Sequence, residues 1–190
     1  MKEVKNILLV SGSGRNCGKT SVVCHLISQL TGKDKVYGLK ITPHFHLTGK
    51  SQQLVFEGKG YKIFKENDSY SNKDSSRMLK AGADEVYFIQ CVDVNLQKAY
   101  KHLKKLIPEN CPVICESGSF ANVYKPGFHI LVKGITVDET KVSYRSNVKR
   151  ADVILTYDEF SITDFDQTID FKEMNWTLNR IKHDQVRRSA

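Results

Sequence analysis

One stretch of the sequence, Ser11-Gly12-Ser13-Gly14-Arg15-Asn16-Cys17-Gly18-Lys19-Thr20, joins an apolar run to a helical pattern. The run before it, Ile7-Leu8-Leu9-Val10, is typical of a buried strand, and the apolar residues after it recur at helical spacing. Strand, glycine-rich loop, Gly-Lys-Thr and helix form the sequence context of a phosphate-binding P-loop. The strict pattern has glycine where this chain has Ser13, and a side chain as small as serine is expected to be accommodated. The stretch therefore predicts a nucleoside triphosphate site.

The residue types of this loop explain how it would hold phosphate. Glycine lets the backbone curl so that successive N–H groups converge on an anion, and the helix start adds unpaired N–H groups and a partial positive charge. Lys19 is expected to reach the β- and γ-phosphates, where it also assists catalysis, and the Thr20 hydroxyl to hold Mg²⁺. The predicted nucleotide-binding residues are Gly14, Arg15, Asn16, Cys17, Gly18, Lys19, Thr20 and Ser21.

The composition is that of a globular protein with a basic surface. Apolar residues make up 40% and charged residues 26% of the 190 residues, so a single α/β domain over residues 1–190 is expected. No apolar run approaches the length of a membrane span, and the N-terminus has no signal-peptide pattern, which predicts a cytoplasmic protein without a membrane partner. The net charge of +8 suits an anionic ligand. Nucleic acid is not expected, because no interleaving of basic and aromatic residues appears.

The five cysteines, Cys17, Cys24, Cys91, Cys111 and Cys115, have no paired CxxC spacing. In a cytosolic chain they are expected to be reduced thiols. Cys111 and Cys115 flank a buried strand pattern, and small buried thiols are the expected interpretation there rather than a zinc site. Cys17 differs because it lies in the predicted phosphate loop, where a lysine and a helix N-terminus lower the pKa of a thiol.

Strand and helix patterns alternate along the chain. Strands are expected at residues 5–10, 35–41, 86–89, 113–115, 128–132 and 153–155, and helices at 19–30, 73–81, 95–107 and 173–186. Strands that are apolar throughout are buried on both faces. The pattern therefore predicts an α/β fold of P-loop NTPase type, with a doubly wound, mostly parallel sheet.

Between the second strand and the next helix lie two short apolar runs around Gly58-Lys59-Gly60. Such a pattern predicts a β-hairpin, here over residues 52–66. A hairpin inserted into an α/β domain usually projects from it. Its expected role is that of a lid or of a dimer arm.

Three further segments carry residues suited to ligand contacts. Lys40 and His44 lie at the carboxyl end of the second strand, where α/β proteins bind ligands, and His46 gives His44 the spacing of a strand-borne metal pair. Lys73, Asp74 and Ser75 open a helix, where they could cap it or contact phosphate or a partner. Glu116 ends an apolar strand, where a P-loop protein keeps the catalytic carboxylate that holds Mg²⁺ or its water. We expect Thr20 and Glu116 to hold the metal.

Together these segments resemble those of the MobB family, the P-loop auxiliary proteins of molybdopterin-guanine dinucleotide biosynthesis. The resemblance is carried by Asn16-Cys17-Gly18-Lys19-Thr20, Gly38-Leu39-Lys40-Ile41-Thr42-Pro43-His44, Lys73-Asp74-Ser75-Ser76-Arg77-Met78-Leu79-Lys80-Ala81-Gly82-Ala83 and Glu116. It covers residues 4–120. The chain differs from the family at Ile41, where members usually have histidine, and in the Ser-Gly-Ser that follows Glu116.

The resemblance implies a doubly wound α/β fold, a homodimer and Mg²⁺-dependent GTP binding with weak GTPase activity. It also implies assistance to the guanylyltransferase that attaches GMP to molybdopterin during molybdenum cofactor biosynthesis. No guanine-reading motif is visible, so the residues themselves leave GTP and ATP open. Two other functions stay open as well: a P-loop kinase or ligase that phosphorylates a small metabolite, and a non-enzymatic module that senses nucleotide and docks a partner.

Overall fold

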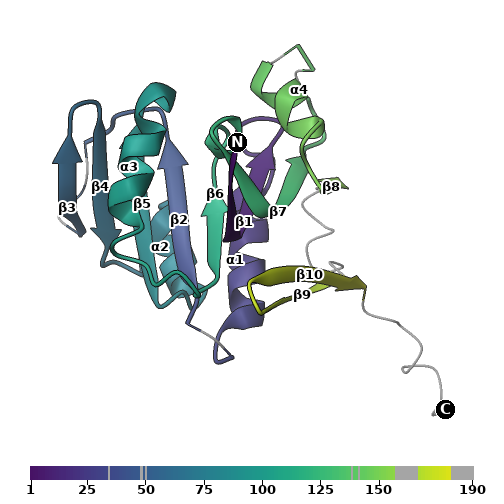
Figure 1. The fold of residues 1–190 in the computed structure, drawn as a ribbon, viewed down its shortest axis with the longest axis horizontal. Helices are drawn as coiled ribbons and strands as arrows, with labels where there is room; N and C mark the ends of the chain where they lie inside the picture. Colours follow the sequence, from purple (N-terminus) through teal and green to yellow (C-terminus); the bar gives the residue numbers. More distant parts are fainter. Residues whose placement is uncertain are drawn as a thin grey trace.

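The computed structural model describes residues 1–33, 35–47, 49, 51–137, 139–140, 142–156 and 167–180. In this part of the chain, eight strands form one sheet in the order β3-β4-β5-β2-β6-β1-β7-β8, and β9 and β10 form a separate pair (Figure 1). The strands of the large sheet are β1 (Lys2–Gly12), β2 (Tyr37–Thr42), β3 (Gln52–Gly58), β4 (Tyr61–Glu66), β5 (Glu85–Cys91), β6 (Val113–Glu116), β7 (Tyr124–Lys133) and β8 (Val153–Thr156). The helices are α1 (Lys19–Leu30), α2 (Asp74–Lys80), α3 (Leu96–Leu103) and α4 (Val142–Val148), with short 3-10 turns η1 (Asp93–Asn95) and η2 (Phe120–Asn122).

The sheet is mostly parallel. Each neighbouring pair from β5 through β2, β6, β1 and β7 to β8 is parallel, whereas β4 runs antiparallel to both β5 and β3. The predicted α/β class with a mostly parallel sheet is therefore confirmed. In a parallel sheet the carboxyl ends of the strands lie at one edge, so the segments that follow β1, β2 and β6 are brought together there.

Two hydrophobic clusters cover the two faces of the sheet. Alternate residues of β1 divide between them, because successive side chains of a strand point to opposite faces: Ile7 and Leu9 belong to one cluster, Leu8 and Val10 to the other. The first cluster contains the buried face of α3, and the second contains residues of α1, α2 and the β9–β10 pair. Among the described residues, no helix has the length and apolar character needed to cross a bilayer.

The predicted hairpin is present as β3 and β4, joined by a two-residue turn in which Gly60 has a φ of 78°. Its inner strand pairs with β5 along Tyr61 to Lys65. The hairpin thus extends the large sheet at one end, with β3 as the outermost strand (Figure 1). Tyr61 and Ile63 are buried against the chain's own core.

The predicted helix over residues 173–186 is wrong where the structure describes it. Strands β9 (Gln167–Lys172) and β10 (Asn175–Arg180) form an antiparallel hairpin there, and residues 181–186 lie outside the described residues. The physical reason is an alternation in which Ile169, Phe171 and Trp176 are buried against α1 and the sheet. The turn between β9 and β10 carries no glycine, and Glu173 and Met174, which favour helices, occupy it instead. The sequence therefore has no turn signal at this position.

Candidate functional site

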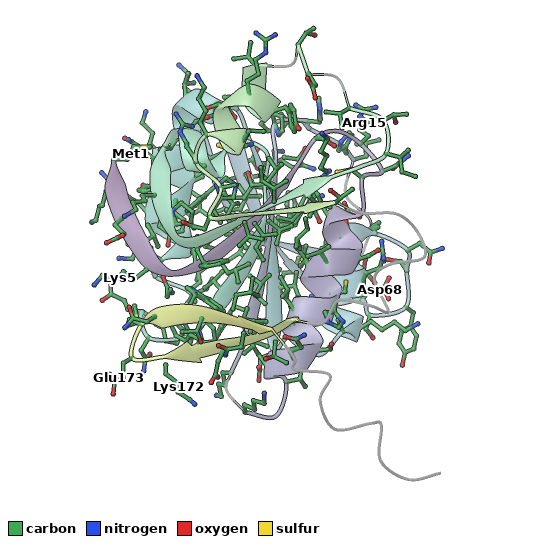
Figure 2. The ribbon with its side chains drawn as sticks, turned by 90° about the vertical axis from the view of Figure 1, so that its right-hand side faces the viewer. Met1, Lys5, Arg15, Asp68, Lys172 and Glu173 are labelled. Carbon is green, nitrogen blue, oxygen red and sulfur yellow. The ribbon has the colours of Figure 1, made fainter. Side chains whose placement is uncertain are left out.

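The loop between β1 and α1 closes tightly on itself. A Cβ atom built on Gly12 would lie 2.5 Å from Cys17 Sγ and 2.7 Å from Lys19 Cγ, so a side chain at this position has no room. Gly18, just before α1, has a φ of 86°, and Asn16 has a φ of 55°. These left-handed positions turn the chain from the strand into the helix. Arg15, which is labelled in Figure 2, and Asn16 are exposed in this loop.

Ser13, the departure from the strict glycine pattern, is buried and hydrogen-bonded through its backbone N–H and its hydroxyl. Its N–H donates to Val132 O at 2.9 Å, and its hydroxyl accepts from the N–H of Gly134 at 3.0 Å. The serine thus fastens the loop to the end of β7. The small residue that the sequence required at this position has a local structural role.

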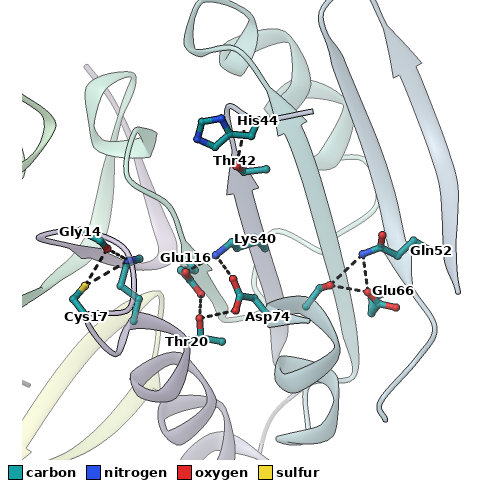
Figure 3. A network of polar contacts seen from close by, with 12 residues as sticks. Gly14, Cys17, Thr20, Lys40, Thr42, His44, Gln52, Glu66, Asp74 and Glu116 are labelled. Atoms are coloured by element: carbon teal, nitrogen blue, oxygen red, sulfur yellow. Dashed lines mark hydrogen bonds and ion pairs between the residues drawn. The ribbon is translucent and has the colours of Figure 1, made fainter. Parts of the chain in front are cut away.

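Lys19 and Cys17 lie inside the loop. Lys19 Nζ donates to Gly14 O and lies 3.4 Å from Cys17 Sγ (Figure 3). Cys17 is buried. Its burial raises the pKa of the thiol, but hydrogen bonding at Gly14 and the Lys19 ammonium outweigh burial, so the pKa of Cys17 lies below its ordinary value. The expected acidification of this thiol is therefore present.

Four side chains from separate parts of the chain meet beside this loop (Figure 3). Lys40 Nζ donates to Asp74 Oδ2 at 2.6 Å and to Glu116 Oε1 at 2.5 Å. Thr20 Oγ1 lies 3.0 Å from Asp74 Oδ1 and 2.8 Å from Glu116 Oε2. Each carboxylate therefore turns one oxygen to the ammonium and the other to the hydroxyl. We call Thr20, Lys40, Asp74 and Glu116 the carboxylate cluster.

Strand register and two helix starts position the carboxylate cluster. Lys40 of β2 and Glu116 of β6 are direct neighbours in a parallel pair, and Glu116 is in turn the neighbour of Val10 of β1. Thr20 and Asp74 lie in the first turns of α1 and α2. The Arg77 guanidinium donates to Ser21 Oγ at 3.1 Å and ties these two helices together.

Burial makes the electrostatics of the cluster strong. The Glu116 side chain is 2% exposed and that of Lys40 17%, whereas that of Asp74 is 41% exposed. Burial alone lowers the pKa of Lys40, but the Glu116 and Asp74 carboxylates outweigh it and raise this pKa above its ordinary value. For Asp74, burial raises the pKa, but the Lys40 ammonium and the Thr20 hydroxyl outweigh it and hold the pKa below its usual range. The ammonium is thus held charged between two carboxylates.

The other predicted contact residues lie outside this cluster. Ser75 Oγ donates at 2.6 Å to Glu66 Oε2, away from Thr20, and Lys73 is exposed at the start of α2. His44 is exposed and lies apart from the carboxylates, and its backbone N–H donates to Thr42 Oγ1 (Figure 3). Its ring centroid is 6.0 Å from that of His46.

Sequence reasoning missed a second buried carboxylate, Glu66, at the end of β4. It is 2% exposed and accepts hydrogen bonds from Gln52 Nε2 at 2.9 Å and from Ser75 Oγ. The bonds join the β3–β4 hairpin to the residue next to Asp74. An acidic residue at the end of a strand pattern was the available signal, since the same signal singled out Glu116.

The oxygen donors fit Mg²⁺ in part. Within the described ranges, no group of three or more His, Cys, Asp or Glu side chains is placed to hold a metal ion. Thr20, Asp74 and Glu116 offer a hydroxyl and two carboxylates, which is the chemistry Mg²⁺ prefers when substrate phosphates and waters complete its shell. The same two carboxylates are bound to Lys40. The fully buried Cys115 has a pKa raised well above its ordinary value by that burial.

Comparison with known proteins found no matching family model, no similar curated protein and no similar solved structure.

Proposed function

We propose that this chain is a Mg²⁺-dependent nucleotide-binding protein of the P-loop NTPase type. The observation that carries the proposal is the convergence of four separately predicted segments. Thr20, Lys40, Asp74 and Glu116 come from α1, β2, α2 and β6, yet their polar atoms lie within hydrogen-bond distance of one another. Clusters of ionisable groups with perturbed pKa values, such as this one at the starts of α1 and α2, are concentrated at functional sites.

The residues of the β1–α1 loop have defined tasks in this proposal. The backbone N–H groups of residues 14–21 would bind the phosphates, because the left-handed Gly18 leads the chain directly into the positive end of α1. Lys19 now donates to Gly14 O and would exchange that carbonyl for a phosphate oxygen. The exposed Arg15 and Asn16 border the same loop and would contact the rest of the nucleotide.

The carboxylate cluster would hold the cation. Thr20 and Glu116 are the proposed ligands of Mg²⁺ or its waters, with Asp74 beside them. When bound with the nucleotide, Mg²⁺ neutralises phosphate charge and orients the phosphates. Glu116 is nine-tenths or more buried, so its carboxylate is fixed relative to Thr20 and would position a water or accept its proton.

The resemblance to the MobB family supplies the more specific form of this proposal. The segments that carry the resemblance contain all four residues of the carboxylate cluster, together with Lys19 of the loop. We therefore propose GTP as the nucleotide, weak GTPase activity, a homodimer, and assistance to a molybdopterin guanylyltransferase. The β3–β4 hairpin is the insertion in the P-loop domain.

A second candidate function, phosphoryl transfer to a small metabolite, is favoured by one observation. The Asp74 side chain is 41% exposed, so it is accessible to an acceptor while it contacts Lys40. A kinase needs such an accessible carboxylate to position the acceptor hydroxyl. It would release ADP only in the presence of the acceptor.

Calorimetric titration of GTP, ATP and GDP, each with Mg²⁺ and with EDTA, tests the proposal. We expect GTP to bind with Mg²⁺, and Lys19→Ala to lose most of that affinity, because it removes a charge-assisted contact of about 1.5–3 kcal/mol. Lys5→Ala, an exposed lysine at the other end of β1, is the matched control and should bind as the parent does. No binding of any triphosphate, or equal binding by Lys19→Ala, would overturn the proposal, and a preference for ATP would favour the second candidate.

A further inference from the structure

We infer that Lys40 is a tethered cation that stands in for the divalent metal until nucleotide arrives, and that metal and Lys40 exchange on the same carboxylates. The inference rests on the proposed function and deepens it. Its starting point is that the carboxylate cluster already contains a positive group. Lys40 Nζ is bonded to Asp74 Oδ2 and to Glu116 Oε1 (Figure 3).

Both carboxylates of the cluster already have a positive partner. The oxygens Asp74 Oδ2 and Glu116 Oε1 bind the ammonium, and Asp74 Oδ1 and Glu116 Oε2 lie 3.0 and 2.8 Å from Thr20 Oγ1. A divalent cation that binds both carboxylates would therefore have to share them with the Lys40 ammonium. Lys40 then leaves, because two positive charges on the same carboxylates repel each other, and the burial of Glu116, which is 2% exposed, strengthens that repulsion.

Burial explains why the chain keeps an ammonium in this position. Glu116 is 2% exposed, and a carboxylate so buried is costly unless it is paired. Lys40 supplies the pairing in the free protein. This pairing makes the site selective for metal that is bound to nucleotide. Free metal competes poorly with a covalently attached counter-ion, whereas metal that arrives with a triphosphate brings further ligands and displaces Lys40.

The displaced ammonium has a place in the same scheme. Lys40 lies on β2, next to the strand that carries Glu116, and Lys19 directly precedes Thr20 at the start of α1. Once it leaves the carboxylates, Lys40 is available to the phosphate that the sequence predicted as its partner. The pairing seen here and the predicted phosphate contact are then two successive states of one side chain.

Binding of Mn²⁺ in the absence of nucleotide tests the exchange. It is measured as the decrease in the electron paramagnetic resonance signal of free Mn²⁺. Lys40→Met should bind Mn²⁺ at least tenfold more tightly than the parent, because the competing charge is gone. Lys65→Met is the matched control, since Lys65 pairs with a single carboxylate, Glu85, at 2.7 Å on a neighbouring part of the sheet. This control should bind Mn²⁺ as weakly as the parent.

Two further variants keep the test decisive. Lys40→Gln retains two amide donors for the carboxylates, so it serves if Lys40→Met fails to fold. It should also bind Mn²⁺ more tightly than the parent does. Lys40→Arg keeps the charge and should match the parent. Neutral variants that bind Mn²⁺ no better than the parent overturn the exchange. A parent that binds no nucleotide overturns the proposed function instead, and this is measured separately by calorimetry.

Discussion

The hydroxyl of Thr20 lies 2.8 Å from Glu116 Oε2, although 96 residues separate them in the chain. The contact ties the start of α1 to the end of β6. Glu116 is also the in-register neighbour of Val10, near the end of β1. The side chain that would hold a cation and the carboxylate that would assist it are thus arranged before any ligand binds. Pre-arranged groups lower the cost of ordering them later.

Thr20→Ala is expected to weaken Mg²⁺-dependent nucleotide binding by about tenfold, because it removes one oxygen ligand worth on the order of 1–2 kcal/mol. In EDTA the variant and the parent should bind alike, since the phosphate contacts of the loop remain. Thr20→Ser keeps the hydroxyl and is the matched control. Calorimetry with and without Mg²⁺ measures both, and an equal loss in EDTA would mean that Thr20 acts on loop structure instead.

Glu116→Gln is expected to abolish hydrolysis and to leave triphosphate affinity within a few-fold of the parent. The amide keeps the size of the side chain and one oxygen that can face the cation or its water, but it cannot accept a proton, and the phosphate contacts lie elsewhere. Phosphate release measures hydrolysis, with Glu85→Gln as the control on the same sheet. Unchanged turnover would assign the catalytic carboxylate to another residue, and Asp74, which shares Lys40 and Thr20, is the next candidate.

The predicted site residues could be recognised because each carries a local signal. Gly18, Lys19 and Thr20 precede a helical period, and Glu116 follows an apolar strand. Parallel strands bring such ends to one edge, so their proximity followed from the fold class. The bonds of Lys40 could not be predicted, because its partners lie 34 and 76 residues away and depend on strand register.

The errors have physical causes of the same kind. The sequence predicts a helix from residue 173 where the structure has the turn and β10, because the turn has no glycine and the buried residues alternate over short strands only. The bonds of Ser75 to Glu66 depend on how the hairpin meets α2, which no local pattern records. Local signals therefore identified the residues, and tertiary packing decided which of them touch.

Stability is expected to fall between pH 7 and pH 5 through His129. This side chain is buried with Nε2 at 2.8 Å from Ser11 Oγ, and burial lowers the pKa of His129 to about 4. The unfolded chain takes up the proton near pH 6.5, so the stabilisation is present above that pH and is lost as the pH falls toward 4. The loss at pH 5 is about 2 kcal/mol for a shift of this size.

Urea unfolding of the parent and of His129→Gln at pH 7 and pH 5 checks this expectation. Glutamine removes the titration and keeps a group that can bond Ser11, so the difference between the two pH values should shrink by about 2 kcal/mol. The exposed His44→Gln is the matched control and should keep the parental difference. An unchanged difference in His129→Gln would assign the pH dependence to other groups.

Glu173→Asn is expected to stabilise the chain by roughly 0.5–1 kcal/mol, because asparagine is favoured over glutamate in a two-residue hairpin turn with positive φ. Glu173 and Met174 form this turn with φ of 51° and 62°. Glu173 is exposed, so its replacement costs no packing, whereas Met174 packs against the core. Urea unfolding measures the gain, with the exposed strand residue Lys172→Asn as a control that should show none.

The chain is expected to form a homodimer through β3, the outer strand of the large sheet. Tyr61 and Ile63 of the hairpin are covered by the chain's own core, and the Phe56 ring stacks on His102 with centroids 3.9 Å apart. Leu54 and Val55, 47% and 38% exposed, remain uncovered on the outer strand. The pairing register shifts between Leu54 and Phe56, and the consecutive residues Leu54 and Val55 are both exposed there. A second copy placed by a two-fold axis would cover these side chains and pair the open edge.

Sedimentation of the parent and of the double variant Leu54→Lys, Val55→Lys tests this dimer. The parent should sediment as a dimer at micromolar concentration and the double variant as a monomer, because lysines on an outer strand oppose edge pairing. Replacing the whole hairpin is unsuitable, since Ile63 is part of the core. Tyr70→Lys changes an exposed aromatic side chain outside β3 and is the matched control. A dimer that survives the double variant has its interface elsewhere, and a monomeric parent contradicts the dimer itself.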